Sequence, residues 1–339
     1  MDIGDPCHRY RNNMVSLRSA HRQLTKMRDI VDDALEDFVQ EKMASNQAPA
    51  MSLAREVLLA GGKRYRPVLA LLAYQAAGGK EISKVMDLAL SAEIIHTATL
   101  VHDDIYDSSK TRRGKPTLHA SHGLAHGIIG GDYLFVLGFG LGGKYDARIV
   151  ERMANTCANI ASGELLQHEH IGNLATTPED YYSIIDGKTA GPFATACSCA
   201  AIIAGASEEV INSLDQFGWE VGRAFQLVDD LLDLLGDEKM GKPRGGDVHE
   251  GKMTLPIIHA LTMLHGVERE HLADILQNFS DDRWNELVSL LSVAGSFEYS
   301  EQLIENHVNR ALIHLESLAD TDARNLMAEV AKRSRSRKR

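Results

Sequence analysis

Apolar residues recur every three to four positions along most of this chain, and alternation with a period of two is scarce. The stretch 91–107, SAEIIHTATLVHDDIYD, is typical, because its apolar positions continue for three turns at helical spacing before the aspartates begin. The pattern predicts helices at 17–45, 50–60, 67–77, 83–106, 122–140, 146–171, 179–203, 207–236, 254–264, 267–277, 281–294 and 297–319. Because Ala, Leu, Glu and Met dominate these segments and aromatic residues are few, the chain is predicted to be all-α.

The breaks between the predicted helices are short, and no linker rich in Pro, Gly and Ser divides the 339 residues. A hydrophobic content of 44% is enough to build one large core. We therefore expect a single domain over residues 1–339, with a flexible N-terminus and a basic C-terminal tail at 332–339, KRSRSRKR. The net charge of −11 argues against nucleic acid as a partner.

The chain carries no obvious targeting signal. No apolar run approaches the roughly 18 residues of a membrane span, and the start MDIGDPCHRYRNN lacks the charged-then-apolar order of a signal peptide. Four scattered cysteines without metal-ligand neighbours favour reduced thiols over disulfides. We expect a cytoplasmic protein without stable membrane insertion.

A short acidic pattern occurs twice, as DDIYD at 103–107 and as DDLLD at 229–233, each time near the end of an apolar helix. Carboxylates four positions apart share a helix face and repel one another, and negative charge at a helix C-terminus opposes the helix dipole. One copy would be typical of a solvated helix end. Two copies on apolar helices predict a cation between them, and carboxylate oxygens shared with substrate phosphates are the ligands that Mg²⁺ prefers.

Basic loops accompany both acidic arrays. GGKRYRP, residues 61–67, places basic side chains directly before a helix that opens with proline, where free N–H groups also favour an anion. KTRRGKP follows the first array at 110–116, and GDEKMGKPRGGDVHEGKMTLP follows the second at 236–256. Arginine side chains are suited to bidentate phosphate contacts, so the combination predicts a Mg²⁺–diphosphate site.

Taken together, these motifs resemble those of the trans-isoprenyl diphosphate synthases. The resemblance covers residues 50 to 260 and follows the order of that family: GGKRYRP, HDDIYD, RRGKP, GDYL, SGELLQ, GKTAG, FQLVDDLLD and GDEKMGKPRGGDVHEGKMTLP. It implies a large helical bundle around a central cavity, which condenses isopentenyl diphosphate with an allylic diphosphate and forms a homodimer.

The resemblance also implies a role for each matching residue. The metal site would hold three Mg²⁺ ions, with Asp103, Asp107 and Asp229 as ligands. Asp104, Asp230 and Asp233 would support this site, and Asp233 would also serve as a ligand. The allylic diphosphate would be neutralised by Arg112, Lys188, Lys242 and Lys252. Isopentenyl diphosphate would be bound by Lys63, Arg66, His96 and Arg113, and the reacting region would be lined by Thr189 and Gln226.

Product length is expected to depend on the helix that carries Asp103, because the growing chain should run along it from the diphosphate. Ala98 and Thr99, five and four positions before Asp103, are small, whereas farnesyl-forming members of the family carry aromatic residues there. Ile95 is a candidate stop one turn further. The resemblance therefore implies a product longer than C15, in the range C20 to C35.

Two rival functions remain at this stage. A class I terpene cyclase has a similar helical cavity but needs no isopentenyl diphosphate site, and the motif GGKRYRP and the second aspartate array argue against it. A non-catalytic subunit that regulates a partner synthase usually has degraded aspartate arrays, and both arrays here are complete.

Overall fold

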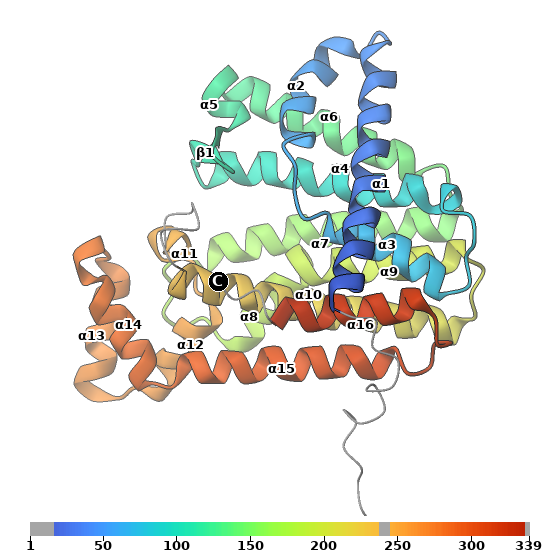
Figure 1. Ribbon diagram of the computed structural model, residues 1–339. Helices are drawn as coiled ribbons and strands as arrows, with labels where there is room; N and C mark the ends of the chain where they lie inside the picture. The colour runs from blue at the N-terminus through green and yellow to red at the C-terminus, as the bar shows by residue number, and fades with distance from the viewer. Residues whose placement is uncertain (1–16, 237–244, 336–339) are drawn as a thin grey trace, which may run out of the picture.

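The computed structural model describes residues 17–236 and 245–335 of the chain, and almost all of its secondary structure is helical (Figure 1). The first half contains α1 (Leu17–Met43), α2 (Ala48–Leu58), α3 (Tyr65–Ala76), α4 (Ser83–Tyr106), a hairpin of β1 (Thr111–Arg112) and β2 (Lys115–Pro116), α5 (Leu118–His122), α6 (Leu124–Gly142) and α7 (Ala147–Glu169). The second half contains α8 (Pro178–Ile185), a π-helical turn η2 (Asp186–Ala190), α9 (Gly191–Ile203), α10 (Glu208–Leu235), α11 (Gly246–His249), α12 (Leu255–Met263), α13 (Gly266–Gln277), a 3₁₀ turn η4 (Asp281–Arg283), α14 (Trp284–Val293), α15 (Ser296–His314) and α16 (Asp322–Arg335).

The prediction of an all-α fold is confirmed, and most helix boundaries lie within a few residues of the predicted ones. The sequence analysis missed the short helices α5 and α11 and the hairpin, which are too short to produce a periodic pattern.

Helix α16 is the larger correction. The sequence analysis placed a basic tail at 332–339, but α16 continues to Arg335, where the guanidinium pairs with Glu305 at 2.6 Å. The buried residues Ala323, Leu326 and Val330 follow helical spacing, so the signal for this helix was present before the basic run. Residues 336–339 of the predicted tail, and the predicted flexible N-terminus up to residue 16, lie outside the described residues.

Several helices begin at polar side chains that accept hydrogen bonds from backbone N–H groups. The Asp146 carboxylate accepts from the N–H of Ile149 at the start of α7, and Ser207 does the same for Val210 at the start of α10. At the start of α8, the side chains of Thr177 and Asp180 each accept a hydrogen bond from the other's backbone N–H, which forms a capping box. Such caps explain why these helices begin where they do.

Helix α4 lies at the centre of the first half of the bundle, packed between α3, α6 and α9, while α10 packs on α9, α15 and η2. Figure 1 shows the long helices stacked in layers, with α4 and α6 above α7, α9 and α10, and with α15 and α16 below. The buried apolar residues form two clusters, and α10 contributes to both, Phe217 and Val221 to the first and Leu227 and Leu231 to the second. Because α10 connects the two clusters, its acidic C-terminal end is held rigidly against the rest of the bundle.

Helix α6 is the one helix in the described part of the chain that is long and apolar enough, by length and composition, to cross a membrane. This segment was not predicted as a span, because glycines interrupt its apolar residues, although its average hydropathy still meets the criterion. Length and composition are weak evidence by themselves, since a core helix can meet the same criteria, and one face of α6 packs closely on α4.

Candidate active site

The two aspartate arrays end α4 and α10, as the sequence spacing predicts. Asp103 is half-buried, and burial raises the pKa of its carboxyl to about 7, with the charge of Lys188 opposing the rise and those of Glu164 and Asp107 adding to it. Asp107 caps the C-terminus of α4, and Asp229 on α10 is exposed. A half-buried carboxyl whose pKa is raised this far lacks sufficient positive charge in the protein itself.

The second aspartate of each array points into the protein. Asp104 is 4% exposed and accepts a hydrogen bond from Arg112 Nε at 2.7 Å. Asp230 is 2% exposed and accepts from the Tyr181 hydroxyl at 2.6 Å and from Gln226 Nε2 at 2.8 Å, and burial together with the charge of Asp247 raises its pKa to about 8. These two carboxylates therefore orient their neighbours and face away from solvent.

Asp233 binds the backbone of the loop that follows. Its two carboxylate oxygens accept from the N–H groups of Gly246 and Asp247, at 3.0 and 3.1 Å, where α11 begins. These contacts engage both oxygens of a residue that the sequence analysis counted among the metal ligands. Its carboxylate anchors α11 to the end of α10 in this conformation.

Lys188 lies on the π-helical turn η2, opposite the first array. Its ammonium contacts Glu164 at 2.5 Å and donates to Gln167 Oε1 at 2.8 Å, both on α7. The turn itself is held by a bidentate pair in which Arg223 Nε and Nη2 each donate to Asp186 at 2.7 Å. Because π-turns are rare and usually occur at functional sites, this local irregularity supports a functional role for the residues on it.

Thr189, the next residue on η2, is buried and faces α10. Its hydroxyl donates to Gln226 Oε1 at 2.9 Å, while the amide of the same glutamine donates to Asp230. The structure thus brings together Thr189 and Gln226, which the resemblance placed in the reacting region.

A second group of basic residues gathers around the start of α3 and the middle of α4. Arg66 lies 4.7 Å from the ring of Phe193, burial lowers its pKa to about 10, and its Nε is buried without a hydrogen-bond partner. Burial, followed by the charge of Arg66 and the other nearby arginines, lowers the pKa of His96 well below 6.5. Arg113 donates to the carbonyl of Gly61, which places it against the same loop as the exposed Lys63.

The hairpin explains how Arg113 is presented. Arg113 and Gly114 occupy the two turn positions, with φ values of 53° and 74°, between the paired residues Arg112 and Lys115. Positive φ at both positions is typical of tight hairpin turns, but arginine adopts it at an energetic cost. The turn directs two adjacent arginines to different partners, Arg112 to Asp104 and Arg113 to the loop before α3.

Arg64, between Lys63 and Arg66, is a structural residue that the sequence analysis mentioned without a role. Its side chain is 2% exposed, and it donates to Glu93 at 2.6 Å, to Asp32 at 2.8 Å and to the carbonyl of Leu58 at 3.0 Å. Glu93 lies one turn before His96 on α4. The pair therefore fixes the loop that carries Lys63 and Arg66 to the turn that carries His96.

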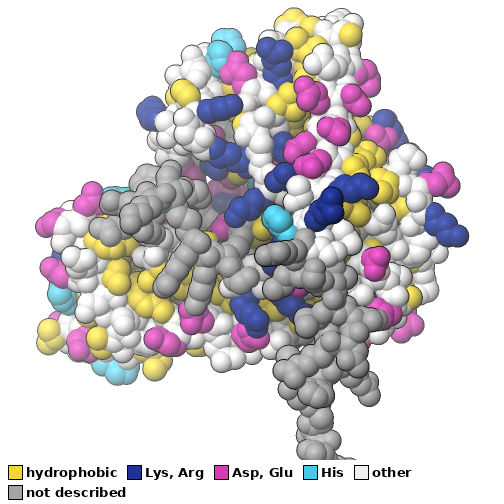
Figure 2. Space-filling model, viewed as in Figure 1, with side chains coloured by type: hydrophobic (Ala, Val, Ile, Leu, Met, Phe, Trp, Pro, Cys, Tyr) yellow, Lys and Arg dark blue, Asp and Glu magenta, His cyan; other side chains and the backbone are white. Residues whose placement is uncertain are grey.

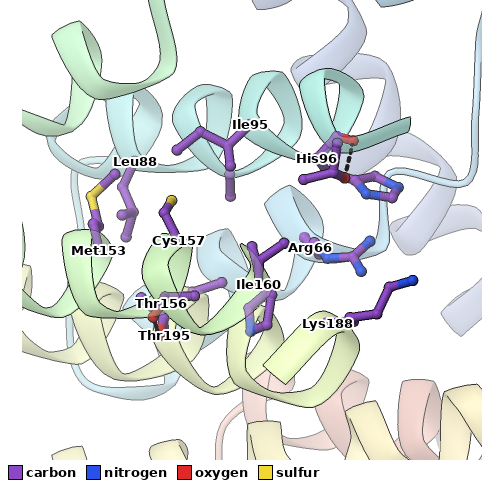
Figure 3. Close-up of a pocket in the computed structure, with 14 residues that line it drawn as sticks. Arg66, Leu88, Ile95, His96, Met153, Thr156, Cys157, Ile160, Lys188 and Thr195 are labelled. Carbon is purple, nitrogen blue, oxygen red and sulfur yellow. Dashed lines mark hydrogen bonds between the residues drawn. The ribbon is translucent and has the colours of Figure 1, made fainter. Parts of the chain in front are cut away.

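An elongated cavity extends from these basic residues between α4, α7 and α9 (Figure 3). Arg66, His96 and Lys188 lie at one end, and Leu88 and Met153 lie at the other. The wall between them is largely apolar and includes Ile95, Cys157 and Ile160, with one polar pair in which the hydroxyls of Thr156 and Thr195 are 2.5 Å apart.

The cavity bears directly on the residues expected to control product length. Thr99 and Ile95 line it, but Ala98 is fully buried and is not part of its wall. Met153 and Cys157 of α7 were missed, because the sequence analysis followed α4 alone and residues so distant in sequence become neighbours only through the fold.

Lys252 connects the two halves of the site, with its ammonium 3.4 Å from Asp107 on α4 and also in contact with Glu250. Lys242 lies outside the described residues. Within residues 17–236 and 245–335, no three His, Cys, Asp or Glu side chains are close enough together to hold a metal ion by themselves. The donors are nevertheless hard carboxylate oxygens, and the raised pKa of Asp103 indicates a place where a divalent cation would stabilise the anion.

Figure 2 shows Lys and Arg side chains gathered in the middle of the face seen there, beside Asp and Glu side chains. Such a mixture of charges is suited to bind a polyanion through both cations and basic side chains.

The chain is similar to known proteins over most of its length. The polyprenyl synthetase family model matches residues 48–291. The chain is 35% identical to an all-trans-nonaprenyl-diphosphate synthase of Rhodobacter capsulatus, over 88% of this chain and 92% of that protein, and 34% identical to a short chain isoprenyl diphosphate synthase of Methanothermobacter thermautotrophicus, over 91% and 95%. The crystal structure of a polyprenyl synthase from Caulobacter crescentus, complexed with calcium and isoprenyl diphosphate, superposes with a TM-score of 0.86 at 32% identity, covering 93% of this chain and 97% of that one.

Proposed function

The chain belongs to the polyprenyl synthetase family of trans-isoprenyl diphosphate synthases, and we propose that its two aspartate arrays bind Mg²⁺ to activate an allylic diphosphate. It is a prenyltransferase that condenses isopentenyl diphosphate with an allylic diphosphate. The observation that carries the metal proposal is the environment of Asp103: burial raises the pKa of its carboxyl, and the basic residue that opposes this rise most strongly, Lys188, lines the polar end of the apolar cavity.

The proposed metal ligands are Asp103, Asp107 and Asp229, with three Mg²⁺ ions expected by resemblance to the family. Bound Mg²⁺ would neutralise the charge that develops on the departing diphosphate. Asp233, which the resemblance also counts among the ligands, is less available to a metal ion, because its two carboxylate oxygens already accept hydrogen bonds from backbone N–H groups. We infer that Asp104, Asp230 and Asp233 act by orienting the site.

The allylic diphosphate is proposed to lie between the arrays, where Lys188, Arg112 and Lys252 already contact carboxylates. Each of these cations pairs with an acidic residue, Lys188 with Glu164, Arg112 with Asp104 and Lys252 with Asp107. A diphosphate that brings its own cations can exchange for these ion pairs at little net cost in charge. Lys242 is proposed to join them.

Isopentenyl diphosphate is proposed to bind to Lys63, Arg66, His96 and Arg113. Supporting this, Arg66 Nε is a buried donor without a partner, and a phosphate oxygen would supply one. The neutral form of His96, favoured by its low pKa, can donate one hydrogen bond without bringing a further buried charge.

The reaction proposed has three steps: ionisation of the allylic C–O bond releases diphosphate, the alkene of isopentenyl diphosphate attacks the allylic cation, and a proton passes to the released diphosphate, the acceptor implied by the family resemblance. Because the Thr189 hydroxyl donates its hydrogen bond to Gln226 Oε1, the lone pairs of its oxygen can face and stabilise an adjacent cation. The apolar wall of the cavity excludes water, which would otherwise capture the allylic cation.

The product is proposed to be longer than C15, in the range C20 to C35. Supporting this, small Thr99 lines the cavity close to the array, and the cavity continues past Ile95 to Leu88 and Met153 (Figure 3). Relatives of almost equal identity carry names of different product classes, so overall identity does not define the length.

We also propose that residues 1–339 form one domain and that two copies form a homodimer through α6. The face of α6 opposite α4 exposes large apolar residues, among them Ile129 at 58% and Val136 at 68% exposure. Large apolar side chains exposed on one face of a helix are suited to a self-complementary interface.

The test is to incubate the purified chain with Mg²⁺, labelled isopentenyl diphosphate and an allylic primer, and then to size the products by chromatography. Asp103→Ala and Asp229→Ala are expected to lower turnover by several orders of magnitude, whereas near-normal rates in either variant would contradict the proposed metal site. A cyclic product that forms without isopentenyl diphosphate would favour a terpene cyclase. Activity that appears only with a partner synthase would favour a regulatory subunit.

A further inference from the structure

A contact between α6 and α7 forms the apolar end of the cavity. The Met153 side chain of α7 is 5% exposed and lines the cavity at the end opposite Arg66 and Lys188 (Figure 3). Gly142 of α6 lies directly behind it. A Cβ atom at position 142 would lie 2.6 Å from Met153 Sδ and even closer to its terminal methyl carbon, so Met153 occupies the space that a side chain at 142 would need.

We propose that Gly142 and Met153 together set the depth of the cavity and hence the length of the product. The inference rests on the proposed prenyl transfer but adds determinants on two helices that do not carry the aspartate arrays. Because Gly142 has no side chain, Met153 can pack back against α6, and the cavity ends further from the diphosphate than it would with a side chain at 142.

The direction in which Met153 would move follows from what surrounds it. Helices α4 and α6 are fixed together near this point, because Ser91 of α4 donates to the carbonyl of Gly138 on α6 at 2.7 Å. A Cβ at 142 would also lie 3.5 Å from Ser91 Oγ, which leaves little freedom on that side. The thioether of methionine is the flexible partner, and the cavity is the open space beside it. A larger residue at 142 would therefore push Met153 into the cavity.

Gly138 has the same relation to Ile95, one helical turn closer to the polar end. A Cβ at position 138 would lie 2.5 Å from Ile95 Cγ1 and 3.2 Å from Cδ1. Ile95 lies between Leu88 and His96 along the cavity in Figure 3. Gly138→Ala should therefore block the cavity nearer to the diphosphate and give a shorter product than Gly142→Ala.

The experiment compares the chain lengths made by the full-length protein and its variants from labelled isopentenyl diphosphate, one allylic primer and Mg²⁺. Gly140→Ala is the matched control, because Gly140 lies on the same helix and a Cβ there would meet nothing within 4 Å. It also controls for the gain in helix propensity of about 1 kcal/mol that every Gly→Ala change brings. Light scattering on each variant verifies that all retain the same oligomeric state.

Gly142→Ala is expected to shorten the main product by at least one C5 unit, and Met153→Ala to lengthen it by at least one. The double variant Gly142→Ala/Met153→Ala should regain at least the wild-type length, because the displaced side chain is gone. Met153→Ala keeps the test valid if Gly142→Ala folds poorly, since its smaller side chain only removes volume.

The inference is overturned if Gly142→Ala and Met153→Ala leave the length of a normal wild-type product unchanged. It is equally overturned if Gly140→Ala shortens the product as much as Gly142→Ala. A wild-type protein that makes no prenyl product at all would overturn the proposed function and, with it, this inference. The wild-type product therefore distinguishes a failure of the proposed function from a failure of this inference alone.

Discussion

The buried ion pair between Arg64 and Glu93 offers a measurable link between folding and substrate binding. Both side chains are at most 5% exposed, and Arg64 Nη1 lies 2.6 Å from Glu93 Oε1. Burial lowers the pKa of Arg64, but the charges and hydrogen bonds of Glu93 and Asp32 raise it overall, so the guanidinium stays charged. Removing the arginine would leave the Glu93 carboxylate buried without its partner.

Arg64→Met is the sharpest perturbation, because methionine keeps most of the aliphatic volume and the same backbone restriction at a φ of 50°. Breaking one side of a buried ion pair typically costs about 3–5 kcal/mol. We expect a loss of this size in the free energy of unfolding, measured by urea titration. The double variant Arg64→Met/Glu93→Leu should recover most of it, because neither member of the pair is then left buried without the other.

Asp32→Asn is the matched control at the other end of the same guanidinium. Asp32 is 40% exposed and pairs with Arg64 at 2.8 Å, so its loss should cost no more than about 1 kcal/mol. Equal losses in Arg64→Met and Asp32→Asn, or no recovery in the double variant, would refute the reasoning.

A kinetic measurement separates positioning from stability. Arg64 joins the loop of Lys63 and Arg66 to the turn of His96, whereas the aspartate arrays lie elsewhere on α4 and α10. In the folded fraction of the double variant, the KM for isopentenyl diphosphate should rise more than the KM for the allylic diphosphate. A parallel rise in both would indicate a general structural effect.

Three further predictions concern other parts of the site. Thr99→Phe should shorten the product because Thr99 lines the cavity, and equal product lengths in wild type and Thr99→Phe would contradict this. Ala98→Phe should instead lower the urea midpoint, because overpacking a fully buried position costs about 1–3 kcal/mol. Burial and the neighbouring arginines hold the pKa of His96 well below 6.5, so the folded state binds fewer protons than the unfolded chain; stability should fall as the pH drops below 6.5, and urea titration should show a flatter dependence in His96→Gln. Asp186→Asn weakens the bidentate pair with Arg223 that holds the π-turn. Steady-state kinetics should show kcat reduced about tenfold, which corresponds to a rise of about 1.4 kcal/mol in the activation free energy. An unchanged kcat would show that the pair contributes to stability alone.

The periodic pattern was sufficient to predict the long helices, because their apolar residues recur at helical spacing over many turns. The pattern at Ala323, Leu326 and Val330 was equally clear, but the basic residues that follow it predicted a tail at 332–339, and α16 was not predicted. The hairpin at 111–116 has no such pattern, since two paired residues on each strand are held by turn geometry at Arg113 and Gly114.

For the site, the spacing of the aspartates predicted which carboxylates share a helix face, but not what each one contacts. Asp233 binds the backbone of Gly246 and Asp247, and that contact depends on how a distant loop returns to α10. Arg64 was indistinguishable in sequence from the basic residues on either side of it. Its buried partner Glu93 is 29 positions away, so only the fold identifies it as structural.

The two ends of the cavity are built in physically different ways, and this difference has a consequence for specificity. At the polar end, ion pairs such as Arg64–Glu93 and Arg223–Asp186 fix the backbone, so a substitution there alters binding and stability together. At the apolar end, Met153 and Ile95 rest against glycines, and a single methyl group changes the available length while leaving every ion pair in place. Because substitutions without shared partners are usually additive, variants at Gly142 or Met153 should change product length with little effect on the KM for either diphosphate. Product length can therefore change through a few residues of α6 and α7 while the chemistry at the aspartate arrays stays the same.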